Sequence, residues 1–128
     1  MLIFGHPWIK SITFKKVFST EDIVQVSSGE IVLLEPLSDS IALAQHCQKN
    51  HIPFAVTVTG ATEAIFSNAL ESKYIVCQLE DATKIQPIAQ EYLFDTKVLT
   101  LIISDREIQK MAELSIDGVI FPEAITVS

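Results

Sequence analysis

Residues that can take part in binding or catalysis follow three apolar segments of the chain. They are Glu35, Ser38, Asp39, Thr59, Gly60, Thr62, Glu80 and Asp81. Carboxylates in such places can act as acid and base or hold a magnesium ion, and a glycine turn before a helix can hold a small anion. The same side chains can instead cap the helices that follow them, where the helix dipole favours negative charge.

The elements that must position these residues alternate along the chain. Short β-branched runs predict strands over residues 30–35, 53–58, 73–79, 97–103 and 118–121, and periodic patterns predict helices over 39–50, 62–71, 87–93 and 105–114. Such alternation is typical of a three-layer α/β fold, Rossmann-like or flavodoxin-like, with a parallel sheet of about five strands. The predicted ligand site then lies where the carboxyl ends of the strands meet.

The first 29 residues lack the alternating strand and helix patterns of the rest of the chain. We expect them to form an N-terminal β extension of a single domain spanning 1–128. Residues 2–9 and 11–18 can pair as a hairpin, or residues 1–5 can add one more strand to the main sheet. Trp8, Phe14 and Phe18 can form an exposed aromatic patch for a protein partner, or they can cover the sheet.

The sequence lacks the residues that several common kinds of site require. A dinucleotide site needs glycines after the first strand, whereas residues 35–40 contain none and include Pro36. Cys47, His46 and His51 are too few for a metal site, and we expect a core cysteine beside surface histidines. No Ser-His-Asp set can be assembled, so we expect no catalytic residues, no metal and no cofactor.

The composition of the chain limits the kinds of partner that we expect it to bind. The chain has 9 Lys and Arg against 16 Asp and Glu, a net charge of −7, which repels phosphate backbones, so we expect no nucleic-acid partner. Its apolar runs are far shorter than the roughly 20 residues that span a bilayer, so we expect no membrane insertion. Cys47 and Cys77 lack CxxC spacing and favour reduced thiols in a cytoplasmic protein, although a disulfide between them is an alternative.

A family resemblance rests on the C-terminal half. Residues 105–122 read as an acidic start, a helix and a strand with a proline stop, residues 59–62 read Thr-Gly-Ala-Thr, and residues 74–81 end a strand on acidic residues. This pattern resembles the TrkA-N or RCK nucleotide-binding regulatory domains of bacterial potassium channels and transporters. It covers residues 29–125 of 128, about three-quarters of the chain.

The chain departs from that family at the residues that would bind the nucleotide. The glycine-rich turn is replaced by residues 35–40, the Asp of the family's Gly-Asp-Ala-Thr turn is absent, and one βα unit is missing between residues 58 and 74. The same C-terminal stretch also resembles a response-regulator receiver, but Gln78 and Pro122 stand near the places of its Asp and Lys. Residues 116–125 are similar to a phosphate-binding half-barrel without its paired glycines.

The resemblance implies a regulatory or protein-interaction module that does not catalyse a reaction, built on a degenerate nucleotide-binding scaffold. Because such domains usually pair, it also implies a homodimer. The alternative is a sensor or enzyme for a nucleotide or phosphometabolite that uses the crevice at the strand ends.

Overall fold

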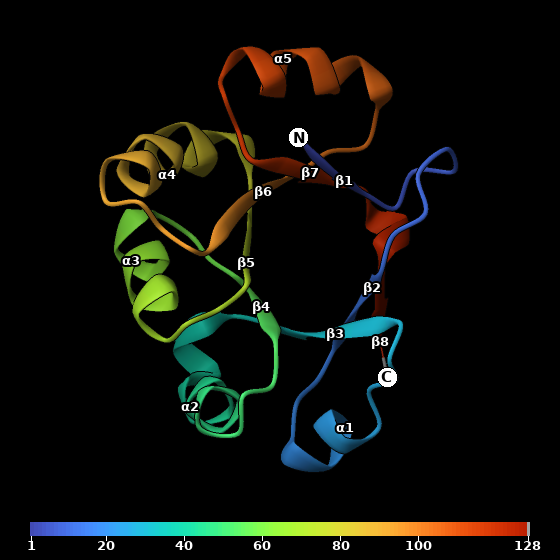
Figure 1. The fold of residues 1–128 in the computed structure, drawn as a ribbon, viewed down its shortest axis with the longest axis vertical. Coiled ribbons are helices and arrows are strands. Elements are labelled where there is room, and N and C mark those ends of the chain that lie inside the picture. The colour runs from blue at the N-terminus through green and yellow to red at the C-terminus, as the bar shows by residue number, and fades with distance from the viewer. Residues whose placement is uncertain (128) are drawn as a thin grey trace.

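All strands belong to one parallel sheet, in the order β1-β7-β6-β5-β4-β3-β2-β8, in the computed structural model, which describes residues 1–127 (Figure 1). The strands are β1 (Leu2–Phe4), β2 (Thr13–Lys16), β3 (Glu30–Leu34), β4 (Phe54–Thr57), β5 (Tyr74–Cys77), β6 (Lys97–Leu101), β7 (Gly118–Ile120) and β8 (Ile125–Val127). The predicted α/β class with a parallel sheet is confirmed. The sheet has eight strands, whereas the sequence pattern predicts about five.

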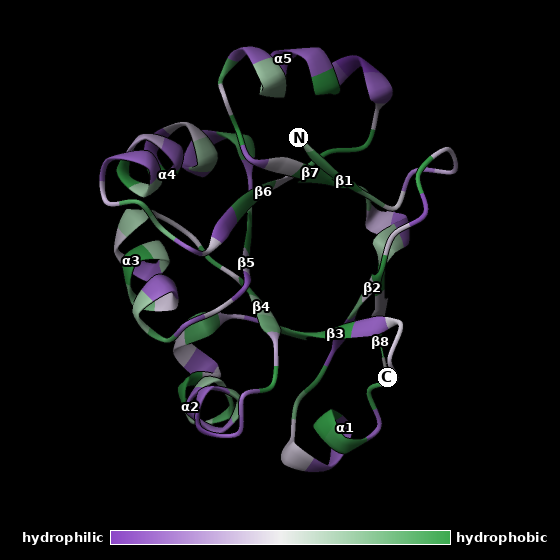
Figure 2. Ribbon diagram, in the orientation of Figure 1, coloured by the Kyte–Doolittle hydropathy of each residue, from purple (hydrophilic) through white to green (hydrophobic). Residues whose placement is uncertain are grey.

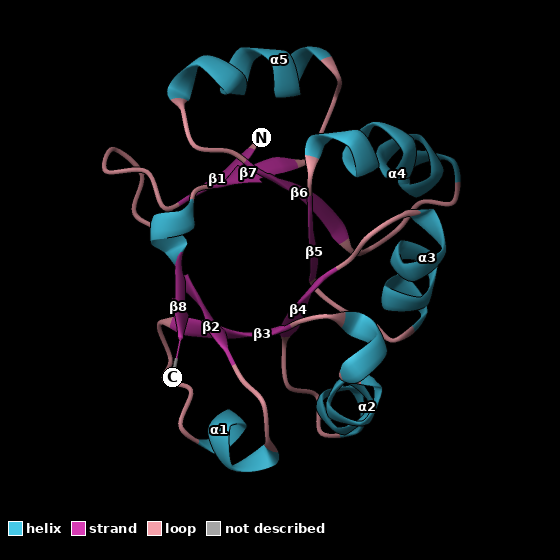
Figure 3. Cartoon of the chain, turned by 180° about the vertical axis from the view of Figure 1, so that it is seen from behind, coloured by secondary structure: helices cyan, strands magenta, loops and turns pink. Residues whose placement is uncertain are grey.

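The five α-helices of the described residues pack on the outer side of this sheet, as Figures 1 and 3 show from opposite sides. The helices are α1 (Thr20–Val24), α2 (Ile41–Lys49), α3 (Ala61–Ala69), α4 (Leu79–Glu91) and α5 (Ile108–Glu113), with 3-10 turns η1 (Leu37–Asp39), η2 (Asp105–Glu107) and η3 (Pro122–Ala124). Within residues 1–127, none of these helices has the length and apolar character needed to cross a membrane.

The sheet curves until its inner face packs on itself. The rings of Phe4 on β1 and Phe14 on β2 lie 5.1 Å apart, and both contact Tyr74 on β5, at 5.3 Å and 5.7 Å. In the ladder, other strands separate β5 from β1 and from β2. Rings from such distant strands can touch only if the strands form a ring, which Figures 1 and 3 show.

Strand alternation divides the buried residues into two cores. The inner core takes one or two residues from nearly every strand and comprises Phe4, Phe14, Ile31, Leu33, Ala55, Tyr74, Val76, Leu99, Ile120 and Ala124. The residues between them face outward and pack under the helices, for example Val32, Ile75 and Val98. Figure 2 accordingly shows mostly apolar strands around the ring and outer helices that carry both polar and apolar colours. Burial on both faces explains why the strands read as continuous apolar runs.

The N-terminal segment is part of this ring. β1 pairs in parallel with β7, and β2 pairs in parallel with both β3 and β8. The hairpin alternative is therefore wrong, and the alternative of one more strand in the main sheet is confirmed. The ladder ends at β1 and β8. Gly5, at φ +88°, packs so closely that a Cβ there would lie 2.9 Å from the Ala124 backbone nitrogen.

The third predicted helix begins earlier than its proline suggests. The sequence predicts a helix over residues 87–93 with Pro87 in its first turn, but α4 starts at Leu79 and holds Pro87 in its interior. Burial explains the longer helix, because Ala82, Ile85 and Ala89 form its apolar stripe against the sheet. Packing of that stripe offsets the loss of one helical hydrogen bond at the proline.

Four helices end with the same motif. The residue after each C-cap has a positive φ, of 56° at His51, 66° at Glu71, 52° at Leu93 and 58° at Ser115. In each case the next N–H bonds the carbonyl five residues back, at 2.8 to 3.0 Å, which makes a Schellman motif. Glycine normally fills this left-handed position because a Cβ is strained there.

Replacing the unpartnered hydroxyl of Thr100 should stabilise the protein. Thr100 is fully buried opposite Cys77 and Val119, and its Oγ1 lacks a hydrogen-bond partner among the described residues. We expect Thr100→Val to raise the free energy of unfolding by about 1 kcal/mol, measured by urea denaturation. The matched control is Thr96→Val, which should lower it because Thr96 Oγ1 donates a 2.6 Å bond to the Ser72 carbonyl. A lower value for Thr100→Val would contradict this account.

Glycine at Leu93 should also stabilise the fold. Leu93 is 84% exposed and has φ 52°, so Leu93→Gly removes backbone strain at little cost in buried area. We expect the free energy of unfolding to rise by about 1 kcal/mol. Glu91→Gly, at the last residue of α4, is the control and should lower it by a similar amount. Equal losses in both variants would show that the position carries no strain.

Candidate functional site

A cavity of about 220 Å³ opens at the carboxyl end of the ring. Six strands contribute to it, from β2 through β6 together with β8. Its lining comprises Lys16, Leu33, Glu35, Thr57, Val58, Thr59, Val76, Cys77, Gln78, Leu101 and Ile125. We call it the mouth cavity. Parallel sheets bind their ligands at this end, because there the loops after several strands converge.

Alternation along the strands places the polar groups of the mouth cavity. Lys16 lies two residues beyond Phe14, and Glu35 two residues beyond Leu33, so both side chains continue the inner face of the ring. By the same spacing Thr57 follows Ala55 and Gln78 follows Val76. A polar layer therefore sits directly above the apolar inner core.

An ion pair crosses this polar layer. Lys16 Nζ lies 2.8 Å from Glu35 Oε2, and the two side chains are 30% and 36% exposed. At this exposure water screens the pair, so it contributes little to stability. Its importance is positional, because it holds one cation and one carboxylate side by side at the edge of a small cavity.

The residues predicted from the sequence separate into two groups. Glu35 and Thr59 line the mouth cavity. The others occupy the starts of the following helices: Ser38 and Asp39 form part of η1, Gly60 is the N-cap of α3, Thr62 lies in the first turn of α3, and Glu80 and Asp81 lie in the first turn of α4.

Sequence reasoning missed three polar residues of the cavity, namely Lys16, Thr57 and Gln78. Each lies at or just beyond the end of a strand, two residues after an inward-facing residue. That two-residue spacing was the available signal. The spacing identifies the cavity residues only once the inner face of the sheet is known. A strand covered on both sides has no polar face that would mark the inner side in the sequence.

Carboxylates of the chain itself occupy three of the helix starts. The backbone N–H of Phe18 donates to Asp22 at 2.9 Å, that of Thr59 to Glu63 at 2.9 Å, and that of Ile103 to Glu107 at 3.0 Å. In every case the acid lies four residues after the residue whose N–H it accepts.

The same local device thus serves three βα connections. The first turn of α4 adds Glu80 and Asp81. A phosphate approaching these helix starts would meet negative charge where phosphate sites normally offer free N–H groups.

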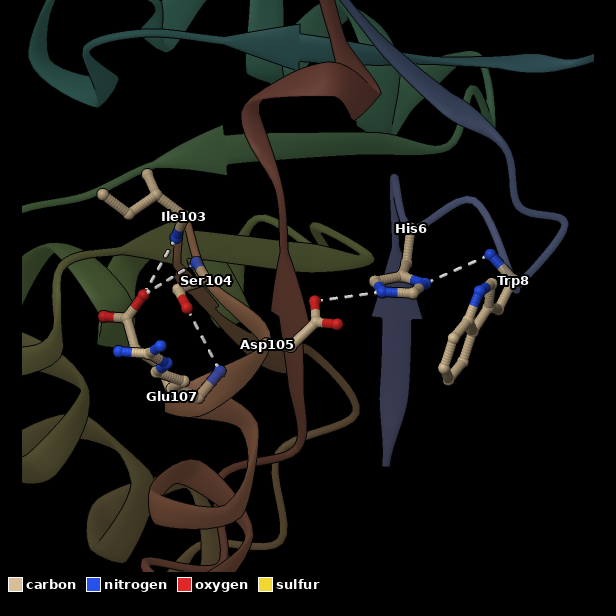
Figure 4. Close-up of polar contacts among 7 residues, drawn as sticks. His6, Trp8, Ile103, Ser104, Asp105 and Glu107 are labelled. Carbon is tan, nitrogen blue, oxygen red and sulfur yellow. Dashed lines mark hydrogen bonds and ion pairs between the residues drawn. The ribbon is translucent and has the colours of Figure 1, made fainter.

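A second polar arrangement joins the end of β1 to η2 (Figure 4). The Trp8 N–H donates to His6 Nδ1 at 3.1 Å, and His6 Nε2 lies 3.0 Å from Asp105 Oδ1. Because Nδ1 accepts, the ring proton sits on Nε2 and is donated to the carboxylate. Both ring nitrogens are therefore engaged, and His6 positions the loop after β1 instead of acting as a base.

The remaining histidines and the cysteines lie away from the mouth cavity or are inert. His46 contacts Asn50 on α2, and His51 follows that helix. Both cysteines are free and buried; burial raises the pKa of Cys47 to about 11, and burial together with the charge of Asp81 raises the pKa of Cys77 to about 12. Neither is a thiolate near neutral pH. Residues 1–127 hold no group of three metal-binding side chains.

Comparison with known proteins adds no relative to this geometry. No family model matches the chain, and no curated protein matches it.

Proposed function

We propose that this chain is a non-catalytic regulatory module that binds a small zwitterionic molecule, the size of an amino acid, in the mouth cavity. The observation that carries the proposal is the Lys16–Glu35 pair beside Thr57, Thr59 and Gln78, above a closed apolar core. A ligand with one carboxylate and one ammonium group can exchange partners with this pair, so that neither protein charge is left unpaired.

The size of the cavity supports a small ligand. At about 220 Å³ it lies below the roughly 300 Å³ at which drug-sized pockets begin. The carboxylates at the surrounding helix starts disfavour phosphorylated molecules, including the nucleotides of the family that the sequence resembles. The scaffold is then a nucleotide-binding one whose phosphate site has been replaced.

Two observations support binding without turnover. His6 has both ring nitrogens engaged, and the thiol of Cys77 at the cavity wall is protonated near neutral pH. A regulatory role follows the resemblance to TrkA-N or RCK domains, and with it we propose homodimers. The two free, buried cysteines support a cytoplasmic location.

A thermal-shift screen tests ligand binding. The probes are the common amino acids, with AMP, ATP, NAD, sugar phosphates and divalent ions as comparison. An amino acid present at a hundred times its Kd should raise the free energy of unfolding by about 2.7 kcal/mol, and the phosphorylated molecules should leave it unchanged. Stabilisation by phosphorylated molecules alone would refute the proposal.

Charge-removing variants then locate the site. Lys16→Met and Glu35→Gln should each weaken ligand binding at least about tenfold, since each leaves one ligand charge without its partner. Lys84→Met and Glu91→Gln are matched controls on the exposed side of α4 and should bind as the parent protein does. If the shift survives both mouth variants, the ligand binds elsewhere. If no probe produces a shift, the result favours a protein-interaction module that binds no small molecule.

Light scattering tests the proposed pairing. Because the apolar Ile65 and Phe66 on α3 are 49% and 57% exposed, a dimer has a surface available to bury. We expect a mass of about twice 14.2 kDa at high protein concentration. A strictly monomeric protein under those conditions would contradict the homodimer.

A further inference from the structure

A second hollow, of about 640 Å³, lies beside the mouth cavity at the carboxyl ends of β1, β6 and β7. It is lined by Gly5, His6, Pro7, Trp8, Ile103, Asp105, Phe121 and Glu123. We call it the Trp8 hollow. Two of its apolar side chains are unusually open to solvent, with Trp8 87% and Ile103 80% exposed. Large exposed apolar groups gathered at one concave place are typical of interaction sites.

Hydrogen bonds hold the backbone around the exposed tryptophan. The backbone N–H of Trp8 donates to His6 Nδ1, and the Ile9 N–H donates over 3.0 Å to the His6 carbonyl. The His6 ring is itself fixed by Asp105 on one side and by an edge contact to Trp8, with ring centroids 5.3 Å apart (Figure 4). A second edge contact joins it to Phe121, with centroids 5.4 Å apart. The indole is therefore presented by a fixed loop, which lowers the entropic cost of binding to it.

The charge of the Trp8 hollow is of one sign. Its carboxylates are Asp105 and Glu123, and among the described residues no Lys or Arg belongs to its lining. The Asp105 side chain is 64% exposed and uses one oxygen for His6, so its second oxygen is available to a ligand. Aromatic faces and carboxylates together attract a guanidinium or ammonium group through cation–π and ionic contacts.

We propose that the Trp8 hollow is a docking site for a basic segment of another protein, with an Arg or Lys side chain stacked on Trp8 between Asp105 and Glu123. Charge complementarity carries this choice of partner, since the chain has a net charge of −7 and the charged groups of the hollow are carboxylates. Ile103 packs against the aliphatic part of the docked residue. The site is independent of the mouth cavity and of any ligand bound there.

Fluorescence provides a direct readout, because Trp8 is the single tryptophan of the chain. An octapeptide of alternating Arg and Gly should change the emission saturably, and the effect should weaken as salt rises from about 20 to about 300 mM. An octapeptide of alternating Glu and Gly should leave it unchanged. Failure of the Arg peptide to produce a saturable change would overturn the proposal.

Variants separate specific docking from general attraction to an acidic protein. The double variant Asp105→Asn and Glu123→Gln should weaken binding of the Arg peptide at least about tenfold, while the amide introduced at position 105 keeps an oxygen that accepts from His6. The double control Glu91→Gln and Glu113→Gln removes the same charge from α4 and α5 and should bind as the parent does. Equal weakening in both double variants would mean non-specific attraction and would sink the site.

Calorimetry on Trp8→Ala tests the stacking contact. This variant keeps the hydrogen bond to His6, which uses the backbone N–H, so the loop remains and binding should fall at least about tenfold. Unchanged affinity would overturn the assignment, as would a homodimer that Trp8→Ala dissociates, since a second copy would then occupy the hollow. The pair Lys16→Met and Glu35→Gln should leave peptide binding intact, which distinguishes this result from failure at the mouth cavity.

Discussion

The inner aromatic cluster is the interaction on which the rest of the structure depends. Phe4, Phe14 and Tyr74 come from three strands that are not neighbours in the ladder, and their ring contacts bring opposite sides of the sheet together. Aromatic pairs of this geometry add about 0.5 to 1.5 kcal/mol beyond the area that they bury. Because side chains of the strands fill the inside of the ring, helices are needed only on the outer face of the sheet. The polar residues that follow on the inner face then lie at the carboxyl end of the ring.

That constraint explains how much could be predicted from the sequence. Strand existence was readable, because strands buried on both faces are continuous apolar runs. The helix predicted over residues 105–114 was readable too, and in the structure Ser104 and Glu107 form a capping box at its start. Curvature was not readable, since whether Phe14 faces a helix or Tyr74 depends on contacts made across the ring. Lys16 and Gln78 were missed for the same reason.

The helix boundaries show a related limit. Pro87 is a strong local signal for a helix start, yet the buried stripe of α4 decides where that helix begins. At the other end, four helices stop on non-glycine residues in the left-handed conformation, where a sequence rule would search for glycine. Local propensity therefore marks the βα units well and their edges less well, because tertiary burial outweighs the small backbone preference of a single residue.

The place of β1 in the sheet affects the order in which the protein can fold. Leu2 pairs with Gly118, so β1 can join the sheet only after nearly the whole chain has been made and β7 has formed. Closing so long a loop carries a larger entropic cost than pairing strands that are close in sequence, so we expect β1 to join the sheet late during folding. His6 and Trp8 lie just after β1. We therefore expect the Trp8 hollow to be assembled last, on a chain whose ring of strands is complete.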